Sequence, residues 1–255
     1  MKRTSWQSLA LLGLMAAAAQ GAEYGNLTGQ ILFDGEAPKP AVLVVTKDEA
    51  YCGPKMLVNE ELLVDPETKG ISNVVLFIRS KVDEKDVHPE VVAAAVAAAK
   101  LRFDNKNCRF EPHVTSIWFA KQALELHNSD DVGHNSNMAP LGDKAVNPLL
   151  PKDATLDYTF KKKQNLPVPV SCNIHPWMKG YVVVRDNPYT VVTPVDGKIE
   201  LKNIPAGKHE FGIWHEKCGW VDTKAWPKGK FDLEIKAGEN DLGVVKLDAK
   251  LFSKK

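Results

Sequence analysis

Residues 171–180 have the sequence SCNIHPWMKG, and this stretch decides how the rest of the chain is interpreted. It places a thiol, an imidazole and a thioether on one short segment, at Cys172, His175 and Met178. Thiolate and thioether sulfur atoms prefer Cu(I), whereas imidazole also suits Cu(II). Because a site that holds both oxidation states needs such a mixture of donors, the stretch predicts a copper site.

This segment lacks a second imidazole, which another histidine must supply. The seven histidines are His88, His113, His127, His134, His175, His209 and His215. His134 is the best candidate, because its sequence NSDDVGHN (residues 128–135) lies just past the predicted strand at residues 123–126. A loop at that place can lie at the same end of a β-sandwich as the Cys172 loop. His113 stays open as an alternative, although choosing it leaves the pattern around His134 unexplained.

The pattern N-x-D-x-x-x-H-N followed by C-x2-H-P-x-M resembles the cupredoxins, the small type 1 blue-copper proteins. The compact second motif is most similar to the ligand loop of amicyanin. The resemblance covers roughly residues 110–185 and implies a single copper with His134, Cys172 and His175 as equatorial ligands. It also implies Met178 as the weak axial ligand, and Asn135 as a hydrogen-bonding link between the two ligand loops.

The resemblance also implies a function. A closed site with four protein ligands leaves no position for a substrate, so we expect an electron carrier and not an enzyme. The ring of His175 is expected to face the surface through an apolar patch with Pro176 and Trp177, which makes these three residues the electron port. The partner is then another redox protein, met through a small, transient interface.

The whole chain resembles longer plastocyanin-like proteins of bacteria, some of them labelled methylamine-utilisation proteins. In these, a cupredoxin is flanked by carboxypeptidase-regulatory-like β-sandwich sequence. The looser resemblance rests on residues 108–113 (CRFEPH), 175–178 (HPWM), 197–201 (GKIEL) and 204–207 (IPAG). It assigns no partner or pathway.

Short apolar and β-branched runs recur along the chain, separated by Gly, Pro, Asn and Asp. This rhythm is typical of a sandwich and predicts an all-β protein. Residues 88–100 (HPEVVAAAVAAAK) depart from it and predict one short helix. We expect a β-rich amino-terminal region at 23–102, a Greek-key cupredoxin sandwich at 103–187 and a small sandwich at 188–255. The amino-terminal region is also compatible with being extra strands of the cupredoxin itself.

The amino terminus predicts an export signal. Lys2 and Arg3 precede an apolar run at residues 9–19 that is too short to span a bilayer. Small residues follow, so we expect a signal peptide at 1–22 and cleavage before Glu23, with an uncleaved anchor as the alternative. No later apolar run approaches the roughly 20 residues that a membrane-spanning helix needs. A soluble periplasmic or secreted protein is therefore expected.

Charge and motifs exclude other classes. Lys and Arg number 33 against 32 for Asp and Glu, so no basic excess is available for binding nucleic acid. The chain contains no C-x-x-C-H, G-x-S-x-G, H-E-x-x-H or P-loop sequence, which argues against c-type haem and several common catalytic sites. Asp130 and Asp131 are adjacent carboxylates with no nucleophile to pair with, and we expect them in a solvated loop.

Four cysteines in an exported chain allow three disulfide connectivities if all of them pair. If Cys172 binds copper, Cys52, Cys108 and Cys218 remain. We expect a Cys52–Cys108 disulfide, since both lie in the amino-terminal half outside the ligand loop. A disulfide between Cys218 and either of them stays open.

Two further functions also stay open. One is a copper storage or delivery protein. The other is a carbohydrate- or protein-binding sandwich without metal, in which Cys172 forms a disulfide.

Overall fold

The structure is a computed structural model that describes residues 23–253. Within this range the chain is built mainly of β-strands with a few short helices, so the predicted all-β fold is confirmed. The predicted signal peptide at 1–22 lies outside the described residues. No helix of the described part is long and apolar enough to cross a membrane.

The helices are α1 (Glu49–Cys52) and α2 (Pro89–Ala97), with 3-10 turns η1 (Gly53–Lys55), η2 (Glu84–Asp86), η3 (Pro227–Gly229) and η4 (Ala249–Ser253). The strands are β1 (Tyr24–Asp34), β2 (Val75–Ile78), β3 (Lys100–Lys106), β4 (Arg109–Glu111), β5 (Val114–Trp118), β6 (Ala123–Asn128), β7 (His134–Asn135), β8 (Asn137–Met138), β9 (Leu149–Leu150), β10 (Thr155–Tyr158), β11 (Val168–Ser171), β12 (Lys179–Arg185), β13 (Thr190–Val192), β14 (Lys198–Pro205), β15 (Gly207–His215), β16 (Gly219–Trp220), β17 (Lys230–Ile235) and β18 (Gly238–Asp248).

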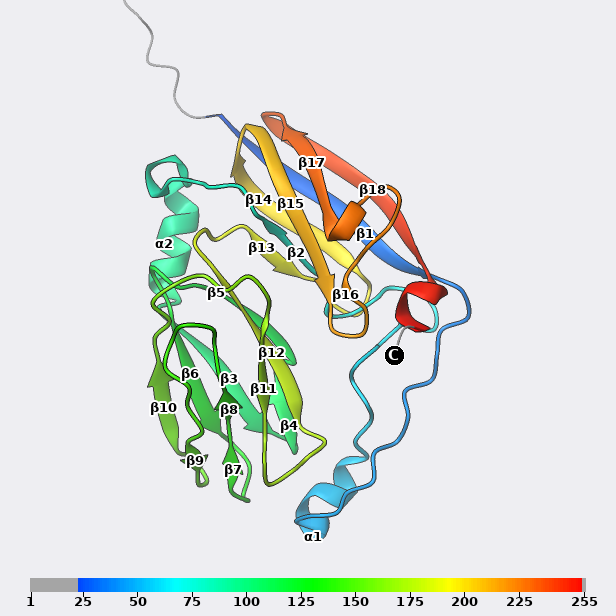
Figure 1. Cartoon of the computed structure of the whole chain (residues 1–255), viewed down its shortest axis with the longest axis vertical. Helices are drawn as coiled ribbons and strands as arrows, with labels where there is room; N and C mark the ends of the chain where they lie inside the picture. Colours follow the sequence, from blue (N-terminus) through cyan, green and yellow to red (C-terminus); the bar gives the residue numbers. More distant parts are fainter. Residues whose placement is uncertain (1–22, 254–255) are drawn as a thin grey trace, which may run out of the picture.

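Strands from both ends of the chain form one sandwich, which we call the terminal sandwich (β1, β2 and β13–β18; Figure 1). One sheet has the order β14-β1-β18, and the other has the order β13-β2-β15-β16 with β17 also paired to β15. Apolar side chains such as Leu27, Leu76, Ile199 and Phe211 come from both sheets into one core.

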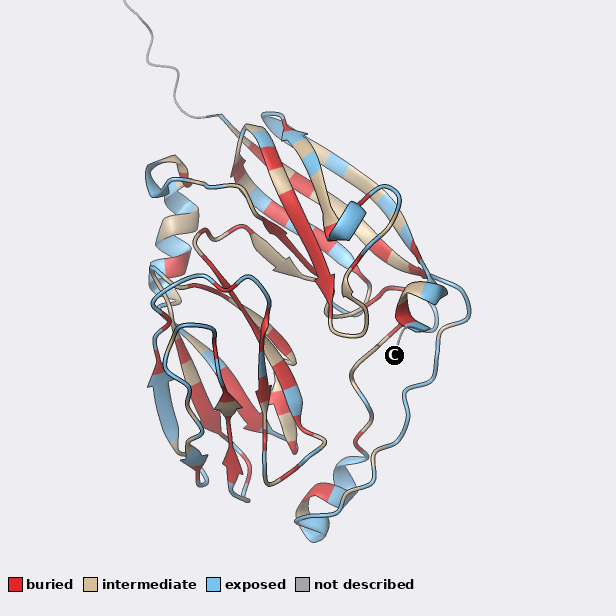
Figure 2. Cartoon of the chain, in the orientation of Figure 1, coloured by how far each residue is buried: buried red, intermediate tan, exposed pale blue. Residues whose placement is uncertain are grey.

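The middle of the chain forms the central sandwich (β3–β12), which lies below the terminal sandwich in Figure 1. Its sheets have the orders β10-β6-β3-β4 and β5-β12-β11-β8, and β7 pairs with β9. Figure 2 shows buried residues concentrated on the strands of both sandwiches. Side chains such as Phe103, Leu126, Val170 and Val182 from the two sheets form its core.

This pairing cuts across the linear division expected from the sequence. Strands β1 and β2 lie in the expected amino-terminal region, yet β1 pairs with β14 and β18, and β2 pairs with β13 and β15. The regions 23–102 and 188–255 therefore share one sandwich, and β3, which crosses the expected boundary at residue 102, belongs to the central one. The rhythm of strands along a sequence does not show which distant strands share hydrogen bonds, because that choice is made by packing.

The expected helix at 88–100 is present as the shorter α2 (Pro89–Ala97). Pro89 occupies the first helical turn, where its missing N–H costs no hydrogen bond, and the Nδ1 atom of His88 accepts a bond from the Glu90 N–H at 3.2 Å. A second, one-turn helix that the sequence did not indicate, α1 (Glu49–Cys52), is present as well.

Helix α1 lies on a long excursion between β1 and β2. Figure 1 shows the chain leaving the terminal sandwich, passing down to the lower end of the central sandwich and returning. We call residues 41–59 of this excursion the flap. Its two arms pair through a bridge between Val42 and Val58 and through a hydrogen bond from Leu43 N to Leu57 O at 2.9 Å. The flap thus carries residues from the amino-terminal region to the far end of the molecule.

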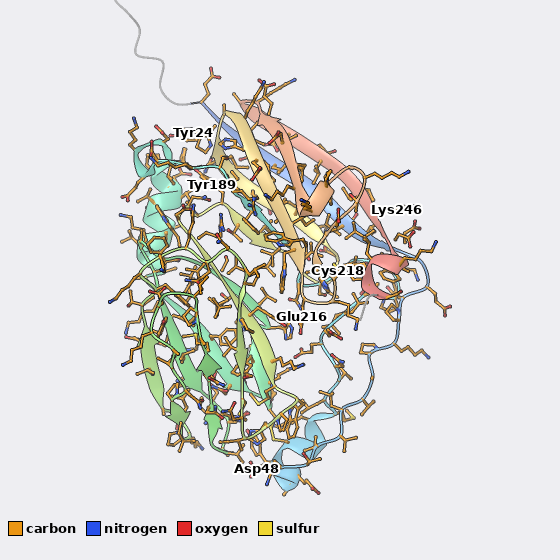
Figure 3. All side chains as sticks on the ribbon, in the orientation of Figure 1. Tyr24, Asp48, Tyr189, Glu216, Cys218 and Lys246 are labelled. Carbon is orange, nitrogen blue, oxygen red and sulfur yellow. A yellow bond between two sulfur atoms is a disulfide. The ribbon has the colours of Figure 1, made fainter. Side chains whose placement is uncertain are left out.

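An apolar cluster joins the two sandwiches. It contains Val75 and Trp214 of the terminal sandwich together with Val114 and Val183 of the central one. Beside it, the buried His113 ring lies 2.6 Å from Glu216 (labelled between the sandwiches in Figure 3) and 3.6 Å from Glu60. Burial alone would lower the pKa of His113, but the bonds to Glu216 and Glu60 outweigh it and raise that pKa to about 9.

This ion cluster predicts a pH dependence of stability. The folded-state pKa of His113 lies above the ordinary histidine pKa of 6.5, so its contribution to stability is fully present below pH 6.5 and is lost as the pH rises through about 9. The contribution is on the order of 3 kcal/mol at low pH. Urea unfolding at pH 6.5 and pH 9.5 is expected to show a smaller difference in His113→Gln than in the unmodified protein. An equal difference in both proteins contradicts this assignment.

Candidate metal centre

The two predicted ligand segments meet at the lower end of the central sandwich. Cys172 directly follows β11, and the loop from Cys172 to β12 is closed by hydrogen bonds from Cys172 N to Met178 O at 3.2 Å and from Met178 N to His175 O at 2.9 Å. His134 begins β7, which comes after β6 on the opposite sheet. These tight local bonds fix the spacing of the three donors on the Cys172 loop.

The sulfur of Cys172 lies between two imidazole rings. Its Sγ atom is 3.9 Å from His134 Nδ1 and 3.6 Å from His175 Nδ1, and the two ring centroids are 4.5 Å apart. Cys172 is 2% exposed and both histidines are 0% exposed. The ligand atoms of these three residues lie within 4.8 Å of one another, the spacing of a group that can hold one metal ion.

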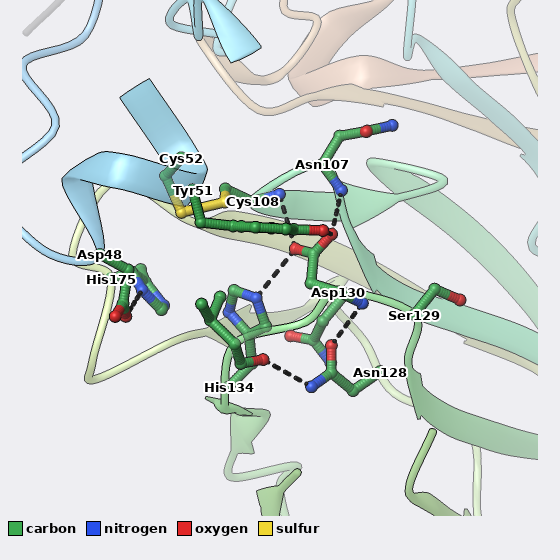
Figure 4. Close-up of polar contacts among 12 residues, drawn as sticks. Asp48, Tyr51, Cys52, Asn107, Cys108, Asn128, Ser129, Asp130, His134 and His175 are labelled. Atoms are coloured by element: carbon green, nitrogen blue, oxygen red, sulfur yellow. Dashed lines mark hydrogen bonds and ion pairs between the residues drawn. A yellow bond between two sulfur atoms is a disulfide. The ribbon is translucent and has the colours of Figure 1, made fainter. Parts of the chain in front are cut away.

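Each of the two rings has a carboxylate on its other nitrogen. His134 Nε2 is 2.9 Å from Asp130 Oδ2, and His175 Nε2 is 2.8 Å from Asp48 Oδ2 (Figure 4). A carboxylate accepts hydrogen bonds, so each Nε2 carries the proton and donates it. The Nδ1 lone pairs then point toward the thiol, which is the tautomer that a metal between these three residues requires.

Asp130 is itself held by several donors. Its carboxylate accepts hydrogen bonds from Asn107 N at 2.7 Å, Cys108 N at 2.8 Å and Tyr51 Oη at 3.0 Å. Burial would raise the pKa of Asp130, but the bond from His134 and these donors lower it overall. Asp130 therefore stays ionised, and it fixes the orientation of His134.

The thiol of Cys172 ionises readily in this setting. Burial raises the pKa of the thiol, but the bonds to His134 and His175 and to backbone groups outweigh burial and bring it to about 6. The pKa of His134 is raised, because its bonds to Asp130 and Cys172 outweigh the effect of burial. The thiolate is the form of cysteine that binds metals, so the site is prepared for a soft cation.

Asn135 links the two ligand segments. Its Oδ1 atom accepts hydrogen bonds from Asn173 N at 2.8 Å and Ile174 N at 3.3 Å, and it lies 3.4 Å from Cys172 Sγ. Its Nδ2 atom donates to Asn147. The predicted link between the loops is thus present in the structure. Met178 is 1% exposed and belongs to the same apolar cluster as Cys172.

The predicted disulfide is present, and its position matters for the site. Cys52 and Cys108 are joined, with their Cα atoms 5.7 Å apart, whereas Cys172 keeps its thiol. The disulfide ties the flap to the central sandwich beside the Asp130 carboxylate. A second metal-like group, Cys108 with Asp130 and His134, uses a sulfur of this disulfide and so offers no thiolate.

The structure differs from the expected electron port at His175. The ring of His175 does not face the surface, because Asp48 of the flap covers its edge. Pro176 is exposed, while Trp177 is half-buried and donates from Nε1 to Cys108 O at 3.0 Å. The contact between Asp48 and His175 could not be predicted from the sequence, because the two residues are 127 positions apart.

Three residues around the site were missed or misread from the sequence. Asp130 was expected in a solvated loop but is 2% exposed, and Asp48 and Tyr51 were not singled out. A signal existed for each. Asp130 precedes His134 by four residues, and a Cys52–Cys108 disulfide necessarily brings Asp48 and Tyr51 near Cys108. His113, the alternative ligand, lies in the ion cluster between the sandwiches.

Comparisons with known proteins find partial structural likeness. No family model matches the chain, and no curated protein matches it. Among solved structures, a Cu(I) form of an amicyanin mutant aligns at 23% identity and TM-score 0.30, over 36% of this chain and 89% of amicyanin. A purple cupredoxin from Nitrosopumilus maritimus aligns at 22% and 0.27, over 34% and 99%. A copper-containing nitrite reductase from Thermus scotoductus aligns at 22% and 0.30, over 34% of this chain and 23% of the reductase.

Proposed function

We propose that this chain is an exported cupredoxin-like protein that holds one type 1 copper and carries single electrons between redox proteins. His134, Cys172 and His175 are the main ligands, and Met178 is the weak axial one. The observation that carries the proposal is the convergence of the Cys172 sulfur with the Nδ1 atoms of two buried histidines. The Nε2 atom of each ring already donates a hydrogen bond to a carboxylate, which leaves Nδ1 as the nitrogen that can bind a metal.

The donor set fits copper in both oxidation states. Two imidazoles, one thiolate and a thioether are the ligand types of blue-copper electron-transfer sites. A copper ion bound here supplies one-electron chemistry by alternating between Cu(I) and Cu(II). The protein holds the donors fixed: the Cys172 loop is closed by backbone bonds, and each ring is held at its Nε2 atom. Fixed donors keep rearrangement small, which keeps the barrier to electron transfer low.

The burial of the ligands supports a carrier over an enzyme. Cys172, His134 and His175 are at most 2% exposed, so a substrate has no direct access to them. Because Asp48 covers the His175 edge, we assign the electron route to Pro176 and Trp177 on the same loop. The ring centroid of Trp177 is 5.2 Å from that of His175, and both Pro176 and Trp177 line a surface pocket.

A copper delivery function is the second candidate, but burial of the ligands favours retention of the metal. A binding module without metal was expected to place Cys172 in a disulfide, and Cys172 is a thiol here. The electron carrier, the copper delivery protein and the metal-free binding module predict different results when the protein is titrated with Cu(II).

One equivalent of Cu(II) added to the purified protein is expected to give an intense blue charge-transfer band and narrow copper hyperfine splitting by electron paramagnetic resonance. The band should bleach on reduction, return on oxidation, and persist for hours with a chelator in excess. Loss of copper to the chelator within seconds supports delivery instead. A colourless protein, with the Cys172 thiol shown to be reactive, contradicts the copper site.

A further inference from the structure

The flap places a carboxylate over the metal centre from an unrelated part of the chain. Asp48 belongs to the amino-terminal excursion, and its Oδ2 atom is 2.8 Å from the Nε2 atom of His175 (Figure 4). The ring of His175 is 0% exposed, whereas the Asp48 side chain is 42% exposed. The burial of this ligand therefore depends on a residue that itself lies at the surface.

We propose that Asp48 is a positioning residue of the metal centre. It holds the Nε2 proton of His175, so that Nδ1 faces Cys172, and its charge makes the ring a stronger electron donor. This inference rests on the proposed function for its effect on copper, but the orientation of the ring is a property of the protein alone.

The backbone of the flap is shaped for this contact. Asp48 occupies the position before α1, where an aspartate side chain normally accepts a hydrogen bond from the first turn of the helix. Here it makes no such bond, and its backbone is in the left-handed region with φ 47° and ψ 41°. Aspartate tolerates this conformation at some cost. The carboxylate is thus turned away from its own helix and onto His175.

Two further bonds keep the flap in place. Cys52, within the same turn, forms the disulfide to Cys108, and Tyr51 donates from its hydroxyl to Asp130 at 3.0 Å. Leu57 and Cys52 pack with Cys108 in a small apolar cluster that also includes Trp177. A single contact from a carboxylate that is 42% exposed contributes little by itself, so these anchors are what hold Asp48 over the ring.

The same turn of the flap also contacts His134 indirectly, through Asp130. The Tyr51 hydroxyl binds the carboxylate that receives the Nε2 proton of His134. One short segment of the flap thus acts on His175 directly and on His134 through Asp130. Carboxylates on ligating histidines fix the ring and raise the basicity of the ligand nitrogen, and their loss typically costs 10–100-fold in metal affinity.

The chain offers variants that separate charge from hydrogen bonding. Asp48→Asn keeps an acceptor for the Nε2 proton but removes the charge. Asp48→Ala removes both. Glu49→Gln is the matched control, because Glu49 is the next residue, is exposed and loses the same charge at nearly the same place.

The first measurement uses the metal-free protein with its disulfide intact. Long-range nitrogen–proton spectra report which nitrogen of His175 carries the proton. We expect a single Nε2–H form in the unmodified protein, Glu49→Gln and Asp48→Asn, and a mixture of both forms in Asp48→Ala. An unchanged Nε2–H form in Asp48→Ala overturns the proposal. This result stands whether or not the protein binds copper.

The second measurement uses the copper-loaded protein. A more basic ligand favours Cu(II), so Asp48→Asn is expected to raise the midpoint potential. A tenfold change in the ratio of Cu(I) to Cu(II) affinity corresponds to about 59 mV for one electron. Asp48→Ala is expected to lower copper affinity about tenfold or more in competition with a chelator. Equal potential shifts in Asp48→Asn and Glu49→Gln overturn the role of the contact. If the unmodified protein binds no copper at all, the proposed function fails and the spectra of the metal-free protein alone decide the role of Asp48.

Discussion

Cys172→Ser is expected to abolish the blue charge-transfer band completely, with at least a tenfold loss of copper affinity. The band requires a thiolate bonded to copper, and Cys172 is the residue whose sulfur lies 3.9 Å and 3.6 Å from the Nδ1 atoms of the two histidines. A serine hydroxyl does not ionise near neutral pH and is a poor ligand for Cu(I). Visible absorption and electron paramagnetic resonance after one equivalent of Cu(II) provide the measurement.

Cys218→Ser is the matched control for this substitution. Cys218 lies at the turn between β15 and β16 of the terminal sandwich, away from the lower end where the centre is (Figure 3). It should leave the band and its intensity unchanged. A band that survives in Cys172→Ser, or disappears in Cys218→Ser, shows that copper is bound by a different sulfur.

Asp130→Ala is expected to destabilise the metal-free protein by about 3–5 kcal/mol, because several buried donors lose their shared acceptor. The carboxylate is 2% exposed and binds His134. Its loss also leaves the N–H groups of Asn107 and Cys108 without their acceptor. Each buried polar group that loses its bond costs about 1–3 kcal/mol, which supports a large effect.

The neighbouring aspartate provides the control for this prediction. Asp131 is 61% exposed and pairs with Lys152 at 2.5 Å on the surface. Asp131→Ala is therefore expected to change stability by less than about 0.5 kcal/mol. Urea unfolding of both variants, with the disulfide intact, measures the difference. Similar values for the two variants contradict a structural role for Asp130 at the centre.

Much of the candidate centre could be predicted because its parts are local in sequence. Cys172, His175 and Met178 lie on one tight loop, so their spacing alone restricts where the donors point. Asn135 follows His134 directly, and Asp130 precedes it by four residues. The Cys52–Cys108 pairing was also expected, and it is present. What was misjudged about Asp130 was its burial, since a pair of adjacent aspartates has the composition of a solvated loop.

The sequence by itself determined the donor set and the all-β character of the chain, because both follow from residue types at short spacing. The tertiary structure decided the rest. It paired β1 with β14 and β18 across almost the whole chain, and it laid the flap over the centre so that Asp48 meets His175 across 127 residues. Such contacts depend on how distant segments pack and on which carboxylate finds a buried donor. Neither leaves a local pattern, so the cover over His175 is a property of the folded chain.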